Sequence, residues 1–164
     1  MDNKLEFLTQ KLTSLENFEG RYSRVIRDAK DYVIDSEKTG RTKLAEAEKA
    51  EKTIFGMKVE AYLRNEFSWP KGKKLDFYIG DIEFDSKATI GKNWMVPPEA
   101  VGELCLLTSI DEEKEIYSAG LLRAIDEVLT VGQNQDKKRS VSAAGKKCIR
   151  WLIEKQPYQA EASS

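Results

Sequence analysis

The sequence LDFYIGDIEFDSK, residues 75–87, decides how this chain folds. Two runs of aromatic and β-branched residues flank the pair Gly80-Asp81, which suits a two-residue primed turn. We therefore expect a β-hairpin whose register is fixed by the turn and places Asp76 opposite Asp85. Because side chains alternate along a strand, the hairpin has one apolar face, which belongs to the core, and one polar face.

Asp76, Asp85 and Lys87 share the polar face of this hairpin. Directly opposed residues have Cβ atoms about 5 Å apart, and like charges at that separation destabilise a sheet. A divalent cation explains such a pair, because it takes oxygen ligands and brings the opposite charge. Lys87 lies two residues beyond Asp85, so its ammonium group can reach the same oxygen atoms.

The composition limits the classes of function that the chain can have. The chain has 164 residues, of which 40% are hydrophobic and 34% charged, and we expect one globular domain. It contains no histidine, which excludes histidine-based acid–base catalysis, serine–histidine nucleophiles and the common zinc sites. The net charge of −1 argues neither for nor against a nucleic-acid partner, since local patches matter more than the sum.

The sequence also bears on the cell compartment. No apolar run is long enough to span a membrane, and the polar N-terminal residues are unlike a signal peptide, so we expect a cytoplasmic protein. Cys105 and Cys148 lie in apolar stretches of separate elements. We expect two buried free thiols, with a disulfide between them as the alternative.

Helices are expected over residues 2–18, 22–35 and 42–67. In the first, leucines recur every three or four residues at positions 5, 8, 12 and 15, and we interpret this face as core packing rather than as a seam between subunits. Asp2 suits the N-cap of this helix. Gly20 is expected to separate the first two helices.

The long third helix carries a carboxylate, Glu60, on an apolar face. A partly buried carboxylate needs a partner, and Arg64, one turn further along, offers a salt bridge. The alternative is that Glu60 joins Asp76 and Asp85 as the third acid of one site.

The second half of the chain is expected to be mainly β-structure. The expected elements are a strand ending at Ile90, a short helix starting at Pro98, strands over 104–110 and 115–125, and a last helix from Ser142 to Lys155. A disordered tail is expected from Gln156. This order predicts an α/β (mixed α+β) fold in which a central mixed sheet is flanked by helices.

The arrangement Asp76…Asp85-x-Lys87 has the form of the acid–acid-x-Lys pattern that many nucleases use. Carboxylates hold Mg²⁺, which neutralises the phosphodiester and lowers the pKa of a bound water. A lysine beside that water favours its deprotonated form and adds positive charge to the transition state. Asp-x-Lys alone is a weak pattern that a solvated strand face also produces, and the hairpin register is what gathers these groups.

Further short motifs follow one order along the chain: Thr39-Gly40-Arg41, Glu51-Lys52-Thr53, Gly56, Val59-Glu60, Glu66-Phe67, Asp76, Tyr78, Asp85-Ser86-Lys87, Trp94-Met95-Val96-Pro97-Pro98-Glu99, Ser118-Ala119-Gly120-Leu121, Lys138-Arg139 and Ala144-Gly145. With these motifs, residues 40–151 resemble the catalytic domain of the NaeI-type restriction endonucleases. That family belongs to the PD-(D/E)xK nuclease superfamily, near the MutH-like mismatch-repair nickases.

The resemblance implies a restriction-endonuclease-like fold and a set of site residues. The family pattern places its acids on Glu60, Asp76 and Asp85, which would bind Mg²⁺, and its catalytic lysine on Lys87. Ser86 stands where the namesake has a cysteine, and its side chain points to the opposite face. The implied domain spans residues 1–155, with N-terminal helices over 1–38, a catalytic core over 39–155 and a disordered tail over 156–164.

The resemblance also implies an activity. We expect a type II restriction endonuclease that cuts double-stranded DNA at a specific sequence, leaves 5′-phosphate ends and acts as a homodimer. The alternatives are a MutH-like monomeric nicking or repair endonuclease and a non-catalytic DNA-binding module. The namesake carries a second, C-terminal DNA-binding domain, and we expect the present chain to be a minimal enzyme without it.

Basic and amide side chains near these motifs are candidates for DNA contacts. They are Lys71, Lys73, Asn93, Lys137, Lys138, Arg139 and Lys146. The alternative for the lysines and the arginine is a solvated charged face. Trp94 and Met95 are expected to lie in the core rather than against bases.

Overall fold

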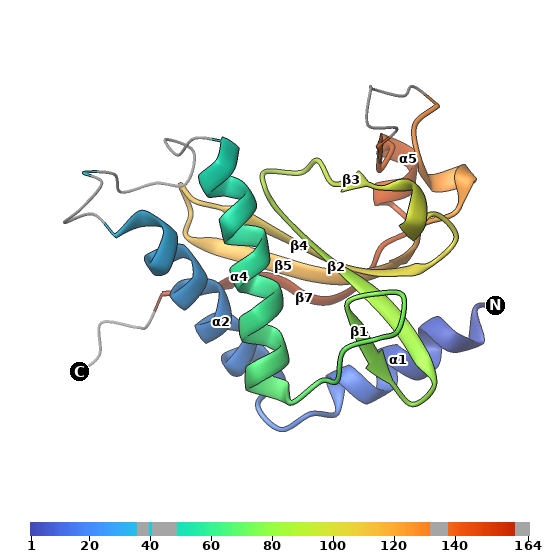
Figure 1. Cartoon of the computed structure of the whole chain (residues 1–164), viewed down its shortest axis with the longest axis horizontal. Coiled ribbons are helices and arrows are strands. Elements are labelled where there is room, and N and C mark those ends of the chain that lie inside the picture. Colours follow the sequence, from blue (N-terminus) through green and yellow to red (C-terminus); the bar gives the residue numbers. More distant parts are fainter. Residues whose placement is uncertain (36–39, 41–48, 132–137, 160–164) are drawn as a thin grey trace.

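The computed structural model of the chain describes residues 1–35, 40, 49–131 and 138–159. Its elements are labelled in Figure 1 and are, in order, α1 (Asn3–Thr13), α2 (Phe18–Ile34), α4 (Lys49–Phe67), β1 (Phe77–Ile79), β2 (Ile82–Ile90), β3 (Met95–Val96), η2 (Pro98–Ala100), β4 (Leu104–Asp111), β5 (Ile116–Arg123), η3 (Asp126–Val128), β6 (Arg139–Ser140), α5 (Ala143–Lys146) and β7 (Arg150–Pro157). Five strands form a sheet in the order β1-β2-β4-β5-β7, and β3 pairs with β6. β2 and β4 are parallel and the other neighbours antiparallel, so the prediction of a mixed sheet flanked by helices is confirmed.

The predicted hairpin is confirmed in its turn and in its register. Gly80 and Asp81 have φ angles of 52° and 69°, the left-handed values that a type I′ turn requires at both central positions. β1 pairs with only the first three residues of β2, and Phe77 lies opposite Phe84. β2 continues for six more residues alongside β4, so its outer edge extends beyond β1 from Asp85 onward.

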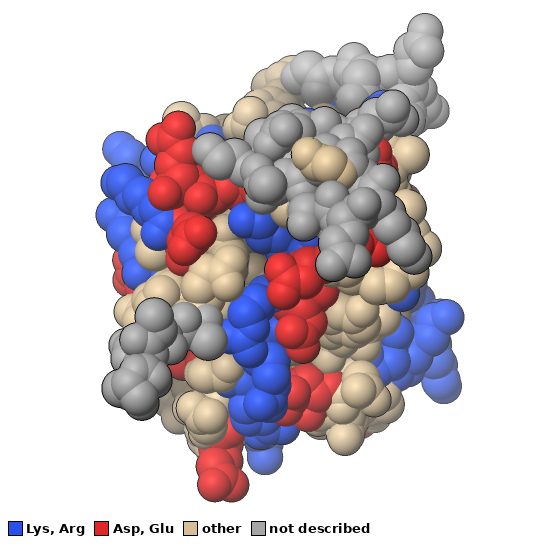
Figure 2. Space-filling view, turned by 90° about the vertical axis from the view of Figure 1, so that its left-hand side faces the viewer, with Lys and Arg blue, Asp and Glu red and all other residues tan. Residues whose placement is uncertain are grey.

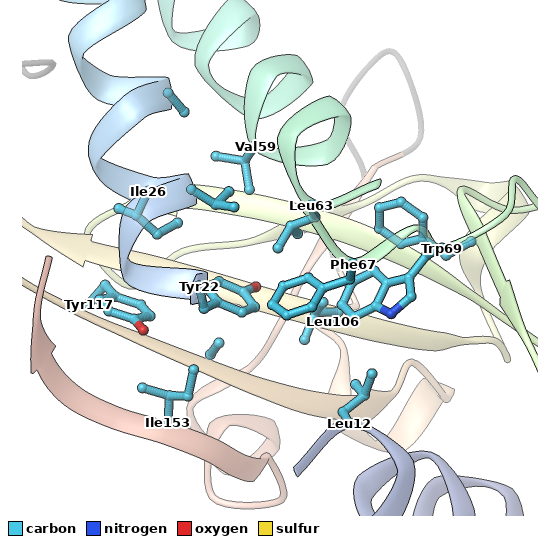
Figure 3. Close-up of a cluster of buried hydrophobic side chains, with 14 of the residues drawn as sticks. Leu12, Tyr22, Ile26, Val59, Leu63, Phe67, Trp69, Leu106, Tyr117 and Ile153 are labelled. Carbon is cyan, nitrogen blue, oxygen red and sulfur yellow. The ribbon is translucent and has the colours of Figure 1, made fainter. Parts of the chain in front are cut away.

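The two faces of the sheet carry separate cores. Along β2 and β4 the side chains alternate, so that Phe84 and Leu106 pack toward the helices, whereas Cys105 and Leu107 pack toward the other face. The helical side is closed by α4, whose buried residues Phe55, Val59, Leu63 and Phe67 recur every four positions. Figure 3 shows this packing, with α2 and α4 contributing residues from one side and the sheet from the other.

The opposite core is smaller and is built by the loops around β3 and β6. It contains Trp94, Val96, Val128 and Val141 together with the residues of β4 and β5 that point away from the helices. The Trp94 indole nitrogen donates to the Thr108 backbone oxygen at 2.9 Å. β3 and β6 were not expected from the sequence, because strands of two residues leave no period to detect.

The N-terminal helix packs on its own chain, as expected from its leucines. Leu8 and Leu12 are fully buried, and Asp2 accepts a hydrogen bond from the Leu5 backbone nitrogen as an N-cap. The expected break at Gly20 is wrong, because α2 already begins at Phe18 and includes this glycine. The break lies instead at Asn17, whose left-handed φ of 48° ends one helical direction before the next begins.

The expected last helix over 142–155 is also wrong. Ser142 caps α5 by accepting from the Gly145 backbone nitrogen at 2.9 Å, but this helix ends at Lys146. The chain then forms β7, which covers the free edge of β5. Backbone pairing with β5 is a long-range interaction that overrides the local helical spacing of apolar residues.

The two cysteines occupy different environments, against the expectation that both are buried. Cys105 lies within β4 and is fully buried, and burial raises the pKa of its thiol to about 12. Cys148 is exposed, because it follows α5 rather than lying inside a longer helix. Both thiols are free.

The segment expected to be a disordered tail is ordered at its start. Gln156 and Pro157 belong to β7, and the next residue, Tyr158, is fully buried. The Lys30 ammonium of α2 donates to the Tyr158 hydroxyl at 3.1 Å and lies 3.4 Å from the carboxylate of Glu112. Residues 160–164 lie outside the described part of the chain, as do 41–48, where the third helix was expected to begin.

The buried tyrosine makes the end of β7 a testable part of the core. Tyr158→Ala should lower the free energy of unfolding by about 3–5 kcal/mol, because it removes a buried aromatic ring and a partner of the Lys30 ammonium. Urea titration at pH 7 measures this loss. Tyr32→Ala is the matched control, since Tyr32 is 55% exposed and its loss should change stability much less. Equal stabilities for the two variants would contradict this packing.

Candidate active site

The carboxylates of Asp76 and Asp85 meet where β1 stops covering the edge of β2. The Asp76 backbone nitrogen donates to Asp85 Oδ1 at 3.3 Å. The Asp76 side chain turns onto the open edge, where its Oδ2 accepts from the Ser86 backbone nitrogen at 2.8 Å. The two acids are therefore held by backbone groups that the hairpin register places there.

Asp85 is a buried carboxylate, with only 6% of its surface exposed. Burial first, and the neighbouring Asp76 second, raise the pKa of its carboxyl group to about 6, while Lys87 acts in the opposite direction. The Lys87 ammonium lies 3.3 Å from Asp85 Oδ2. Partial burial of two acids beside a single lysine leaves a site that attracts further positive charge.

The β2–β4 register shows which face of the sheet carries this chemistry. Asp85 pairs with Cys105 and Lys87 with Leu107, both of which belong to the smaller core. The side chains of Asp85 and Lys87 thus point away from α2 and α4. Ser86 points to the helical face, as its place between them requires, and is buried.

Glu60 reaches this edge from the helical face through an arginine. The guanidinium of Arg64 lies 3.0 Å from Glu60 Oε2 and donates from the same nitrogen to the Asp76 backbone oxygen at 3.2 Å. Within the described residues, no group of three or more histidine, cysteine, aspartate or glutamate side chains lies close enough to hold a metal ion. The site is thus a pair of acids with a lysine, and a third acid linked to them by Arg64.

Sequence reasoning missed the second role of Arg64. The spacing of four residues between Glu60 and Arg64 predicts their ion pair. It does not reveal the bond to the Asp76 carbonyl, which depends on how α4 packs against the hairpin.

The residues expected to contact DNA fall into two groups. Lys71 and Lys73 are exposed in the loop before β1, and the Lys146 ammonium donates to the Asn93 amide oxygen at 3.2 Å. Arg139 has partners within the chain, because its guanidinium bonds Asp126 at 2.6 Å and the Thr130 backbone oxygen at 2.8 Å. Lys138 is exposed, and Lys137 lies outside the described residues.

Trp94 and Met95 differ in burial, although both were expected in the core. Trp94 is buried at 3% exposure, whereas Met95 is 40% exposed. The two side chains leave β3 on opposite sides, as strand alternation requires. The expectation for Met95 is therefore wrong.

The outer face of the two long helices is charge-balanced. Figure 2 shows basic and acidic side chains side by side over the face that lies to the left in Figure 1. Arg21 and Arg24 of α2 both bond the Glu66 carboxylate of α4, at 2.9 and 3.0 Å. Neutralised pairs of this kind do not form the continuous basic surface that a phosphate backbone requires.

No helix in the described ranges is long and apolar enough to cross a membrane.

Comparison with known proteins places the hairpin and its acids in a family. The family model described as "Restriction endonuclease NaeI" matches residues 6–161, which include every residue of the site. A curated relative, "Type II restriction enzyme NaeI" from Lentzea aerocolonigenes, is 33% identical over 146 residues. The match covers 88% of this chain and 46% of the relative, so the chain spans about half the relative's length. The chain belongs to the NaeI restriction endonuclease family.

Proposed function

We propose that this chain is the catalytic part of a type II restriction endonuclease, which hydrolyses phosphodiester bonds of double-stranded DNA at a specific sequence. We further propose that it depends on Mg²⁺, leaves 5′-phosphate ends and acts in the cytoplasm. The observation that supports this most directly is the group of Asp76, Asp85 and Lys87 at the open edge of β2. It occurs in a chain whose family is that of restriction endonucleases.

The donors at this edge fit a divalent cation. Asp76 and Asp85 offer carboxylate oxygens in contact, and oxygen is the ligand that Mg²⁺ takes in proteins. The raised pKa of Asp85 reflects a place where the negative charge lacks compensation. Asp76 and Asp85 would hold the ion, with Glu60 as the third acid. When bound, Mg²⁺ would neutralise the phosphate and lower the pKa of a coordinated water.

The chain's own groups perform the remaining tasks. The Lys87 ammonium, 3.3 Å from Asp85 Oδ2, would hold the attacking water and favour its deprotonated form. Its positive charge would also stabilise the charge that develops on the phosphate oxygens. The Ser86 backbone nitrogen fixes the Asp76 carboxylate, so that the acid faces the ion in one orientation.

A homodimer is the assembly that we propose, since restriction sites with two-fold symmetry suit a two-fold protein. The leucine face of α1 would not form its interface, because Leu8 and Leu12 are buried in the core. A MutH-like monomer is the second candidate. Plasmid that is nicked rather than linearised, by a protein that elutes as a monomer, would favour it.

Lys87→Ala tests the proposed chemistry. Wild-type protein with Mg²⁺ and phage DNA should give discrete bands, and Lys87→Ala should cut about 10²–10⁴-fold more slowly because the attacking water loses its ammonium partner. DNA binding in Ca²⁺ should remain, as measured by gel shift. Lys114→Ala, in the exposed β4–β5 turn, is the control and should cut normally. A Lys87→Ala variant as active as wild type would contradict this mechanism, and DNA binding without any cleavage by wild type would favour a binding module.

Asp85→Asn tests whether the site is arranged for charge rather than for stability. Without metal at pH 8, this variant should unfold at a higher urea concentration, by about 1 kcal/mol, because it removes one of two adjacent buried charges. Asp31→Asn, an exposed carboxylate of α2, should change stability by less than about 0.5 kcal/mol. A marked loss of stability in Asp85→Asn would show that the carboxylate is structural.

Lys146→Ala tests the proposed DNA contact beside Asn93. The affinity for DNA in Ca²⁺ should fall about equally for specific and unrelated sequences, because a phosphate contact carries no base information. The slope of log affinity against log salt should decrease by about 1. Lys11→Ala on α1 is the matched control, and an unchanged slope in Lys146→Ala would exclude the contact.

A further inference from the structure

The side chain of Arg64 lies between α4 and the hairpin and contacts both. One of its terminal nitrogens donates to Glu60 Oε2 at 3.0 Å and to the Asp76 backbone oxygen at 3.2 Å. The guanidinium also lies over the Phe77 ring, 5.3 Å from its centroid. One side chain therefore connects the helical acid to the residue that supplies the first acid of the hairpin.

These contacts differ from those of an ordinary pair on a helix surface. A surface pair at a spacing of four residues needs no partner outside its helix. Arg64 bonds a carbonyl twelve residues further along the chain, and its Nε atom is buried without a hydrogen-bond partner in the described part of the chain. Burial of an unpaired donor is unfavourable, so packing holds this guanidinium in place against a local penalty.

The position of α4 explains why Glu60 needs such a connection. Val59 and Leu63 pack on the helical face of the sheet with Phe84, whereas Asp85 points to the opposite face. Glu60 can therefore meet the Asp76–Asp85 pair only at the open edge of β2. The Arg64 bridge to the Asp76 backbone holds Glu60 at that edge.

On the basis of the proposed function, we propose that Arg64 is a positioning residue for the third metal-binding acid. It holds one oxygen of the Glu60 carboxylate against the Asp76 backbone and leaves the other oxygen for the divalent cation. Groups that hydrogen-bond a ligating carboxylate orient it, and their loss typically lowers metal affinity 10–100-fold. The positive charge of Arg64 opposes a nearby cation, but it is shared by the Glu60 carboxylate, so orientation is the larger effect.

Manganese binding to the DNA-free protein tests this role without any cleavage. Mn²⁺ is titrated into the protein, and the free ion is measured by electron paramagnetic resonance. Arg64→Met keeps the aliphatic packing over Phe77 and should weaken Mn²⁺ binding about 10-fold or more. Arg64→Lys keeps the charge but not the fork, and should bind with intermediate affinity.

A double variant separates positioning from a general effect on folding. In a Glu60→Gln background, Arg64→Met should cause no further loss of Mn²⁺ affinity, because the group that it orients is already lost. Arg24→Met is the matched control. It removes an arginine–glutamate contact of the same 3.0 Å length that involves no residue of the hairpin, and should bind Mn²⁺ like wild type.

The outcomes distinguish this proposal from the proposed function. If Glu60→Gln weakens Mn²⁺ binding and both Arg64 variants bind like wild type, the positioning role is overturned while the metal site stands. Tighter binding by Arg64→Met would also overturn it, because the guanidinium would then be a competitor of the cation. If wild type binds no Mn²⁺, the metal site itself fails and the role of Arg64 fails with it. Should Arg64→Met not fold, Arg64→Lys and the double variant Glu60→Gln/Arg64→Lys decide by the same criteria.

Discussion

The two-residue turn at Gly80-Asp81 is the constraint on which the site depends. Positive φ at both residues closes the hairpin in one register, and that register alone sets Asp76 beside Asp85. A slip of one residue would exchange the faces of the strand and bury the acids among Phe77 and its apolar neighbours. The short β1 is equally important, because it ends before Asp85 and leaves a backbone edge where the Asp76 carboxylate can bind.

Two cores hold this edge rigid from opposite sides. α4 packs on the helical face, and the segments around β3 and β6 cover the other face, so that β2 is fixed where its polar residues alternate with buried ones. Such support is needed because the carboxylate pair destabilises the fold locally. Stability supplied by packing elsewhere sustains an arrangement that is unfavourable in itself and suited to binding a cation.

The sequence predicted the hairpin and its acids because their causes are local. A turn dipeptide and the two-residue period of a strand fix Asp76, Asp85 and Lys87 without reference to distant residues. It failed at β7, where the apolar spacing around Ile149 and Ile153 fits a helix and where pairing with β5 is the stronger influence. The link from Arg64 to the Asp76 backbone was missed for a related reason, since it arises only when α4 and the hairpin pack together.

The location of the two thiols has a consequence for the redox behaviour of the protein. Cys105 is the partner of Asp85 across β2 and β4, so a sulfur atom lies next to the acids in the sheet. Its complete burial keeps the thiol protonated and out of reach of oxidants and of soft metal ions. Cys148 is exposed after α5 and would be oxidised or alkylated first. Oxidative damage would thus begin at the surface and leave the oxygen ligands of the site unchanged.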